Sequence, residues 1–171
     1  LLGGNSPERE VSLESGKAVA GALESLGARV TRIDTAQSDW WQPLLGAELV
    51  FIALHGEGGE DGTVQGMLRT LGIPFTGSDV LASALAMNKT LCKRLWQGMG
   101  LPTQPFAELS GDSDWEGVMA DLGAAFVKPA AGGSSIGTRA VHSAGELEAA
   151  WRDTKQYGDV IAERLIAGAE Y

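Results

Sequence analysis

The chain of 171 residues is long enough for one ordinary domain or two small ones, and its 44% hydrophobic residues suffice for real cores. Its 22 acidic and 13 basic side chains give a formal net charge of -9. This charge opposes a broad electrostatic attraction to nucleic acid or anionic lipid, so we expect neither as a partner and favour a small molecule.

Cysteine content and hydropathy predict the compartment. The single cysteine, Cys92, allows no internal disulfide and no cysteine-based zinc cage, which favours the reducing cytoplasm. The longest apolar run, Leu49 to Leu54, is far shorter than the roughly 20 residues that cross a bilayer.

The chain begins with "LLGG" in place of methionine and ends in an apolar pattern without a cap, so we expect it to be part of a longer protein.

The first half of the chain predicts two β-α units. After the strand-like Leu1 and Leu2, Asn5 and Ser6 are candidate N-caps and Pro7 a first helical residue; "GARVTRID" then supplies a glycine stop and a short strand. The run "AELVFIAL" is apolar on both faces, as in a covered parallel strand, and leads through "HGEGGEDG" to the helical "TVQGMLRTLG" and to "IPFTGS". These units predict a Rossmann-like α/β domain with a parallel sheet over residues 1–78.

Residues 79–100 are predicted to be helical, with a break near Met87 to Lys89. The side expected to be buried carries Leu81, Leu85, Leu91, Leu95 and Trp96. "GLPTQP" is typical of a linker.

The rest of the chain predicts a smaller α+β arrangement. A helix around Trp115 to Leu122 is followed by the strand "AAFVKP", a glycine-serine loop, the strand "TRAVHS", a helix from Ala144 and the strand "DVIAERLI". Ser143 and Glu146 form a capping box for the last helix. The change from wholly apolar strands to shorter, flanked ones indicates a domain boundary near residue 79.

The loop "VKPAAGGSSIG" has two interpretations. Lys128 ends a strand, and the glycines and serines after it offer unobstructed backbone N–H groups and two hydroxyls, which suits a phosphate. The alternative is a plain glycine hairpin, because glycine and serine are the usual turn residues.

Acidic side chains and a histidine follow the predicted strands of the first domain. Glu8 and Glu10 fall in a first helical turn, where carboxylates complement the helix dipole; the alternative is that one of them binds a cationic group of a substrate. His55 follows a buried strand, where open α/β folds place ligands, and the dense glycines and acids after it favour a site.

Further candidates lie in the second half. Lys89 lies near the helix break, whereas Lys93 and Arg94 suggest a solvated helix face. Glu163 and Glu170 lie in an apolar setting and need polar partners.

The order of these motifs resembles one known family. The stretches "LLGGNSPEREVSLESG", "VFIALHGEGGEDGTVQGMLRTLGIPFTGSDVLASALAMNKTLCK", "GLPT", "FVKPAAGGSSIG" and "IAERLIAGAEY" closely resemble D-alanine:D-alanine ligase, an ATP-grasp enzyme. The resemblance implies a substrate-binding α/β domain at 1–78, a central ATP-grasp subdomain at 79–165 and the start of a C-terminal domain at 166–171. It also implies a cytoplasmic homodimer that joins two D-alanines with ATP, through D-alanyl phosphate, for peptidoglycan.

The resemblance also implies roles for single residues. Glu8 would bind the ammonium of the first D-alanine, with His55 lining the same subsite and Ser134 linked to Glu8 as a second catalytic residue. The residues that would bind ATP are Lys89, Lys128, Ser134, Ser135, Glu163 and Glu170. The loop through the two serines would close over the triphosphate as a lid.

The chain departs from the family in ways that limit the expected activity. Ala131 and Gly132 stand where relatives often have charged or polar residues, and Asn88 precedes Lys89 where aspartate is common; neither change removes a proposed contact. The ligands of Mg²⁺ (or Mn²⁺) are expected beyond Tyr171, so we expect these 171 residues alone to be inactive. Two alternatives stay open: a ligase with D-lactate or D-serine as second substrate, and a non-catalytic nucleotide-binding module.

Overall fold

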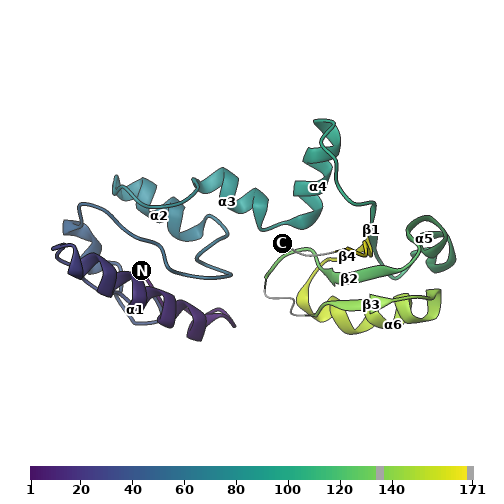
Figure 1. Ribbon diagram of the computed structural model, residues 1–171, viewed down its shortest axis with the longest axis horizontal. Helices are drawn as coiled ribbons and strands as arrows, with labels where there is room; N and C mark the ends of the chain where they lie inside the picture. The colour runs from purple at the N-terminus through teal and green to yellow at the C-terminus, as the bar shows by residue number, and fades with distance from the viewer. Residues whose placement is uncertain (134–136, 169–171) are drawn as a thin grey trace. The chain divides into compact units, whose positions relative to one another are not determined.

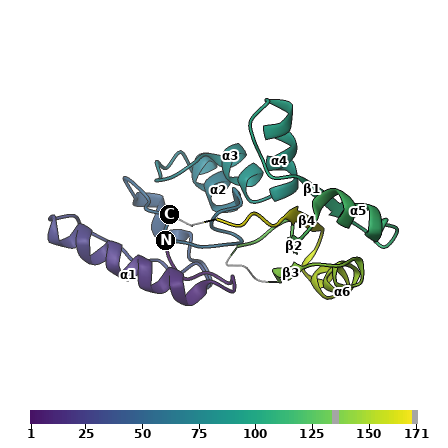
Figure 2. The ribbon, with the colours of Figure 1, turned by 45° about the vertical axis from the view of Figure 1, so that its right-hand side comes forward.

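The computed structural model describes residues 1–133 and 137–168. It divides into two units, Leu1–Met87 and Asn88–Tyr171, which are coloured along the chain in Figure 1. The division falls between helices α3 (Val80–Ala86) and α4 (Lys89–Gly98), whereas the sequence placed a boundary near residue 79. Helix α3 belongs to the first unit because it contacts α2 (Thr63–Leu71), and Figure 2 shows the two in succession.

The first unit consists of helices and extended segments. Helix α1 (Arg9–Ser25) and the 3-10 helix η1 (Gln42–Gly46) precede α2. The extended segments meet at two isolated parallel bridges, Leu2 with Asp34 and Val50 with Phe75. Apolar residues from these segments and α2 form one core, which includes Leu44, Val50, Leu54, Val64, Leu68 and Ile73.

The Rossmann-like parallel sheet predicted for residues 1–78 is not confirmed. The segments have the predicted parallel direction but pair at single bridges, without a ladder. A physical reason is visible at the start of the chain, where Gly3 (φ +75) and Gly4 (φ +79) turn the backbone into the left-handed region directly after Leu2. The first segment therefore ends after one bridge.

Helix α1 begins at Arg9 and not at the predicted Pro7. Glu8 is the residue before its first turn and provides no side-chain cap. The hydroxyl of Ser6 accepts from the Glu8 backbone N–H at 3.2 Å and donates to the carbonyl oxygen of His55 at 2.7 Å. Ser6 therefore joins the start of the helix to the segment that carries His55.

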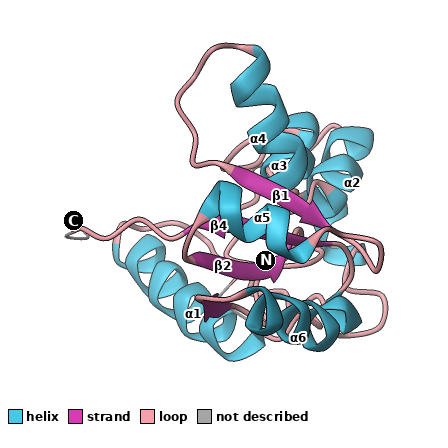
Figure 3. Cartoon of the chain, turned by 90° about the vertical axis from the view of Figure 1, so that its right-hand side faces the viewer, coloured by secondary structure: helices cyan, strands magenta, loops and turns pink. Residues whose placement is uncertain are grey.

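The second unit is built on an antiparallel sheet of four strands in the order β1-β4-β2-β3. Figure 3 shows strands of this sheet in magenta. Its strands are β1 (Phe106–Leu109), β2 (Ala125–Pro129), β3 (Arg139–Val141) and β4 (Val160–Arg164); its other elements are α4, α5 (Trp115–Leu122), α6 (Ala144–Thr154) and the 3-10 helix η2 (Lys155–Tyr157). Strand β1 was not predicted from the sequence.

The two faces of this sheet differ in chemistry. One face packs against α5 and α6 and forms an apolar core that includes Leu109, Leu122, Ala125, Val127, Leu147 and Ala162. The register sets Phe106 and Phe126 on either side of Glu163, and side chains opposite each other in a ladder share a face. Lys128, two residues after Phe126, lies on that face as well. The face away from the apolar core is therefore partly charged.

Helix α6 begins as predicted. The hydroxyl of Ser143 accepts from the backbone N–H of Glu146, and the Glu146 carboxylate accepts from the N–H of His142. The two helices predicted over residues 79–100, with their break, are also present. No helix among the described residues has both the length and the apolar character needed to cross a membrane.

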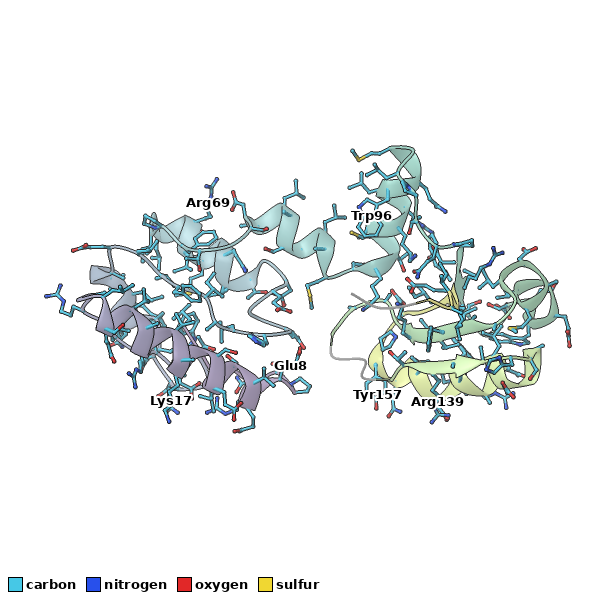
Figure 4. The ribbon with its side chains drawn as sticks, viewed as in Figure 1. Glu8, Lys17, Arg69, Trp96, Arg139 and Tyr157 are labelled. Carbon is cyan, nitrogen blue, oxygen red and sulfur yellow. The ribbon has the colours of Figure 1, made fainter. Side chains whose placement is uncertain are left out.

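The buried side predicted for residues 79–100 was wrong. Leu81, Leu91, Leu95 and Trp96 are exposed, Leu81 at 80% of its surface, and Leu85 is half-buried. The Trp96 side chain is labelled on α4 in Figure 4. The buried residues on these helices are Ser83, Thr90 and Lys93. Helix α4 thus buries its polar side, because Lys93 finds polar partners in the second unit.

Candidate active site

The first group of predicted site residues lies in the first unit, where Glu8 and His55 are close in space. An oxygen of the Glu8 carboxylate, Oε2, lies 2.6 Å from the point where a Cβ on Gly56 would stand. Gly56 also has a φ of +70, which other residues rarely adopt. Figure 4 labels Glu8, the residue that precedes α1. Glycine at position 56 thus allows the carboxylate to approach the backbone next to His55.

The glycine-rich loop after His55 is held by its own acidic side chains. Glu60 accepts from the Gly56 N–H at 3.1 Å, and Asp61 accepts from the N–H groups of Gly58 at 2.8 Å and Thr63 at 2.9 Å. Burial alone would raise the pKa of Asp61, but the backbone hydrogen bonds outweigh it and the net effect lowers that pKa. These two acids shape the loop.

A pocket of about 350 Å³ opens beside this loop. Its lining includes Gly4, Ser6, Trp40, His55, Glu57 and Met67. The Nδ1 atom of His55 is buried and has no hydrogen-bond partner among the described residues. A buried polar atom without a partner is costly in a folded protein, and a ligand or water in the pocket can supply one.

The position of Glu8 is fixed by the residues that follow it on α1. Arg9 forms two hydrogen bonds with Asp34, at 2.9 and 2.6 Å, and donates a third to the Gly4 carbonyl oxygen at 2.9 Å. The Arg9 guanidinium, helped by backbone N–H groups, holds the pKa of Asp34 far below its usual range. Ser12, one turn further, is buried and accepts from the Gly3 N–H at 2.9 Å while it donates to the Ala53 carbonyl oxygen at 2.7 Å. The helix is thereby locked to the turns beside the pocket.

The second group lies in the second unit and surrounds Glu163. This carboxylate, 5% exposed, pairs through Oε2 with Lys128 and through Oε1 with Lys93 at 3.1 Å. Lys89 precedes Lys93 by one turn of α4, and its ammonium donates to the Gly132 carbonyl oxygen at 2.7 Å. We refer to Lys89, Lys93, Lys128 and Glu163 as the lysine cluster.

The surroundings of Lys89 lower the pKa of its ammonium. Burial lowers its pKa, repulsion from Lys128 lowers it further, and attraction to Glu163 opposes these two effects in part. Lys89 is also joined through its backbone N–H to the Ala130 carbonyl oxygen at 2.8 Å, so it is fixed to the end of β2. Two ammonium groups that repel each other beside a glycine turn favour an anion.

The structure therefore brings together three predicted ATP-binding residues, Lys89, Lys128 and Glu163, and separately the predicted substrate residues Glu8 and His55. Each set lies within one unit. The predicted Ser134, Ser135 and Glu170 lie outside the described residues. Lys93 was missed, since it was interpreted as part of a solvated helix face; its spacing of four from Lys89 was the available signal.

Within residues 1–133 and 137–168, no group of three histidine, cysteine, aspartate or glutamate side chains is placed to hold a metal ion. The Mg²⁺ or Mn²⁺ implied by the resemblance therefore has no ligand set among these residues.

Two family models match parts of the chain. A family model described as "D-ala D-ala ligase N-terminus" matches residues 42–78, and one described as "D-ala D-ala ligase C-terminus" matches residues 95–171. The D-alanine--D-alanine ligase of Aromatoleum aromaticum is 53% identical over 173 residues, covering 99% of this chain and 56% of that relative. The chain belongs to the D-alanine–D-alanine ligase family. The ligase of Azoarcus sp. is 51% identical over 99% of this chain and 57% of its own length.

Solved structures of the ligase family also share the fold. A D-alanine--D-alanine ligase from Bacillus anthracis has a TM-score of 0.88 at 31% identity, covering 96% of this chain and 56% of the other. The same enzyme complexed with ATP has a TM-score of 0.85 at 30% identity, covering 96% and 57%. The chain spans about half the length of the curated relatives it matches.

Proposed function

We propose that the full-length protein joins two D-alanines into D-alanyl-D-alanine with ATP, for peptidoglycan synthesis. The observation that carries the proposal is the pair of mutually repelling ammonium groups, Lys89 and Lys128, held beside the glycine turn that ends β2. Relatives named D-alanine--D-alanine ligase, 51% and 53% identical to this chain, support the proposed reaction. A structural neighbour complexed with ATP supports the choice of nucleotide.

In the proposed reaction, an oxygen of the first D-alanine carboxylate attacks the γ-phosphorus of ATP, and the bond from that phosphorus to the bridging oxygen of ADP breaks. The product is D-alanyl phosphate. The amine of the second D-alanine then attacks the acyl carbon, loses a proton and displaces inorganic phosphate. Both reactants in the first step, the D-alanine carboxylate and the ATP triphosphate, are anionic and repel each other. The positive charges of Lys89 and Lys128 offset this repulsion and stabilise the negative charge of the phosphoryl group in transfer.

The residues of the first unit would hold the amino acid. Glu8, fixed by the hydrogen bonds that follow it on α1, would bind the ammonium of the first D-alanine, because a carboxylate attracts a cation strongly at short range. His55, whose Nδ1 has no partner in the described residues, would line the same subsite. We further propose that Ser134 and Ser135 belong to a lid over the triphosphate, that Ser134 links to Glu8, and that Glu170 contacts the nucleotide.

Other parts of the proposal follow from the family. We propose that residues 1–78 work as a substrate-binding domain of Rossmann-like design, that residues 79–165 form the central nucleotide-binding subdomain, and that residues 166–171 begin a C-terminal domain. The full-length protein would work in the cytoplasm as a homodimer and need Mg²⁺ or Mn²⁺.

The test is turnover by the purified full-length protein. We expect phosphate release from ATP only when D-alanine is present, and D-alanyl-D-alanine as the product by mass spectrometry. Lys128→Ala should lower kcat/KM at least a hundredfold, while Glu163 keeps its pairing with Lys93 and the fold persists. The exposed Lys155→Ala serves as the matched control and should leave turnover within about twofold. When D-lactate and D-serine are supplied together with D-alanine, an ester or a D-serine dipeptide as the main product would refute the substrate assignment.

A further inference from the structure

Lys93 is buried and contacts polar groups of its own unit. It lies one turn after Lys89 and is buried, with 4% of its surface exposed. Its ammonium donates to Thr103 Oγ1 at 3.0 Å and to the Gln104 carbonyl oxygen at 3.2 Å, and pairs with Glu163 at 3.1 Å. The Lys93 ammonium thus has two hydrogen bonds and one ion pair, all of them within the second unit.

The charges of the lysine cluster are unequal. Three ammonium groups face one carboxylate, which leaves an excess of two positive charges. Because the Lys93 side chain is 5% exposed, the excess charge is accessible at Lys89 and at Lys128, whose side chain is 23% exposed. Lys93 also lies over the ring of Phe106, 5.4 Å from its centroid, on the charged face of the sheet.

Glu163 needs a second cation if Lys128 is to serve a ligand. A buried carboxylate that loses its only partner is strongly destabilised, so a single lysine at Glu163 would be held there. With Lys93 in place, Glu163 stays paired when Lys128 moves toward an anion.

We propose that Lys93 is a positioning residue for the anion site: it holds the Glu163 carboxylate so that Lys128 is released to bind a triphosphate. This inference rests on the proposed function for the identity of the anion. The competing explanation is that Lys93 only anchors the segment containing Thr103 and Gln104. Under our proposal, replacing Lys93 weakens ATP binding only when Glu163 is present. Under the competing explanation, the same replacement has the same effect without Glu163.

A double-mutant cycle in the full-length protein separates them. We expect Lys93→Met to raise KM for ATP at least tenfold while KM for D-alanine changes less than twofold. In a Glu163→Gln background the same substitution should leave KM for ATP within twofold, because no carboxylate remains to hold Lys128. Arg94→Met is the matched control, since Arg94 is the next residue on α4 and its side chain is 60% exposed. An equal rise of KM for ATP in both backgrounds would overturn the proposal.

A second measurement needs no nucleotide and no activity. Trace acetylation with acetic anhydride, read by mass spectrometry, reports how readily Lys128 is released. We expect Lys128 to react at least threefold more slowly in Lys93→Met than in the wild type, and equally fast in Glu163→Gln with or without Lys93→Met. Unchanged reactivity in Lys93→Met would contradict the proposal. If the wild type fails to bind ATP, the proposed function fails, and the acetylation rates still decide the role of Lys93. If Lys93→Met alone does not fold, the comparison within the Glu163→Gln background remains.

Discussion

Replacing Ser12 by alanine tests how the first unit positions its site. The Ser12 hydroxyl is fully buried and is the hydrogen-bond partner of both the Gly3 N–H and the Ala53 carbonyl. The substitution leaves two buried backbone groups without this partner, and each such group costs about 1–3 kcal/mol. We therefore expect the free energy of unfolding to fall by at least about 2 kcal/mol, a substantial part of the stability of a typical domain.

The assay is urea denaturation of the full-length protein, followed by tryptophan fluorescence. Ser25→Ala is the matched control, because Ser25 lies on the same helix and its hydroxyl makes one exposed hydrogen bond to the Ala22 carbonyl. Substitutions at such exposed sites change stability by about 0.5 kcal/mol or less. Equal denaturation midpoints for the two variants would refute the argument that Ser12 locks α1 to the pocket.

Three further predictions concern the two sites. Gly56→Ala should raise KM for D-alanine at least tenfold, because the added Cβ would stand 2.6 Å from Glu8 Oε2. Gly58→Ala is the control: at φ +82 it introduces the same kind of backbone strain, but its Cβ would meet open space, so KM for D-alanine should change less. Because the pKa of Lys89 is lowered, its ammonium loses its proton at a lower pH than an ordinary lysine does. Calorimetry between pH 7 and 10 should therefore show ATP affinity falling more steeply in the wild type than in Lys89→Arg. The pKa of Asp34 is depressed, so the stability that its carboxylate gives the folded protein is complete above about pH 4 and is lost as pH falls. The difference in melting temperature between wild type and Asp34→Asn should therefore shrink between pH 5 and pH 2. A constant difference would contradict this.

The sequence predicted local features of the fold well because they depend on neighbouring residues. The capping of α6 by Ser143 and the break between α3 and α4 follow from side chains within a few positions. Strand β1 was missed because it has only four residues and follows a stretch with two prolines, so no alternation is visible. Its pairing with β4 is a long-range contact.

Most residues of the candidate site were singled out from the sequence, but the contacts between them were not predicted. Lys128 and Glu163 were each singled out by type and setting, whereas their contact depends on the antiparallel register that sets Phe126 opposite Glu163. Lys93 illustrates the limit most clearly, since a lysine between leucines on a helix suggests solvent. The structure buries it because Glu163 and Thr103, which are distant in sequence, provide its partners.

The exposed apolar residues of α4 show a related limit. Helical periodicity predicted Leu91, Leu95 and Trp96 as one side of the helix, and they do share a side. Periodicity does not say which side meets the sheet, and here the side that carries Thr90 and Lys93 does so.

The most direct test of the account is isothermal titration calorimetry of ATP into the full-length protein and into Lys128→Ala. We predict saturable binding to the wild type and affinity at least tenfold weaker for the variant, because one of the two ammonium groups assigned to the nucleotide is gone. Absence of binding to the wild type, or equal affinity in the two proteins, would contradict the assignment of Lys89 and Lys128 to the nucleotide.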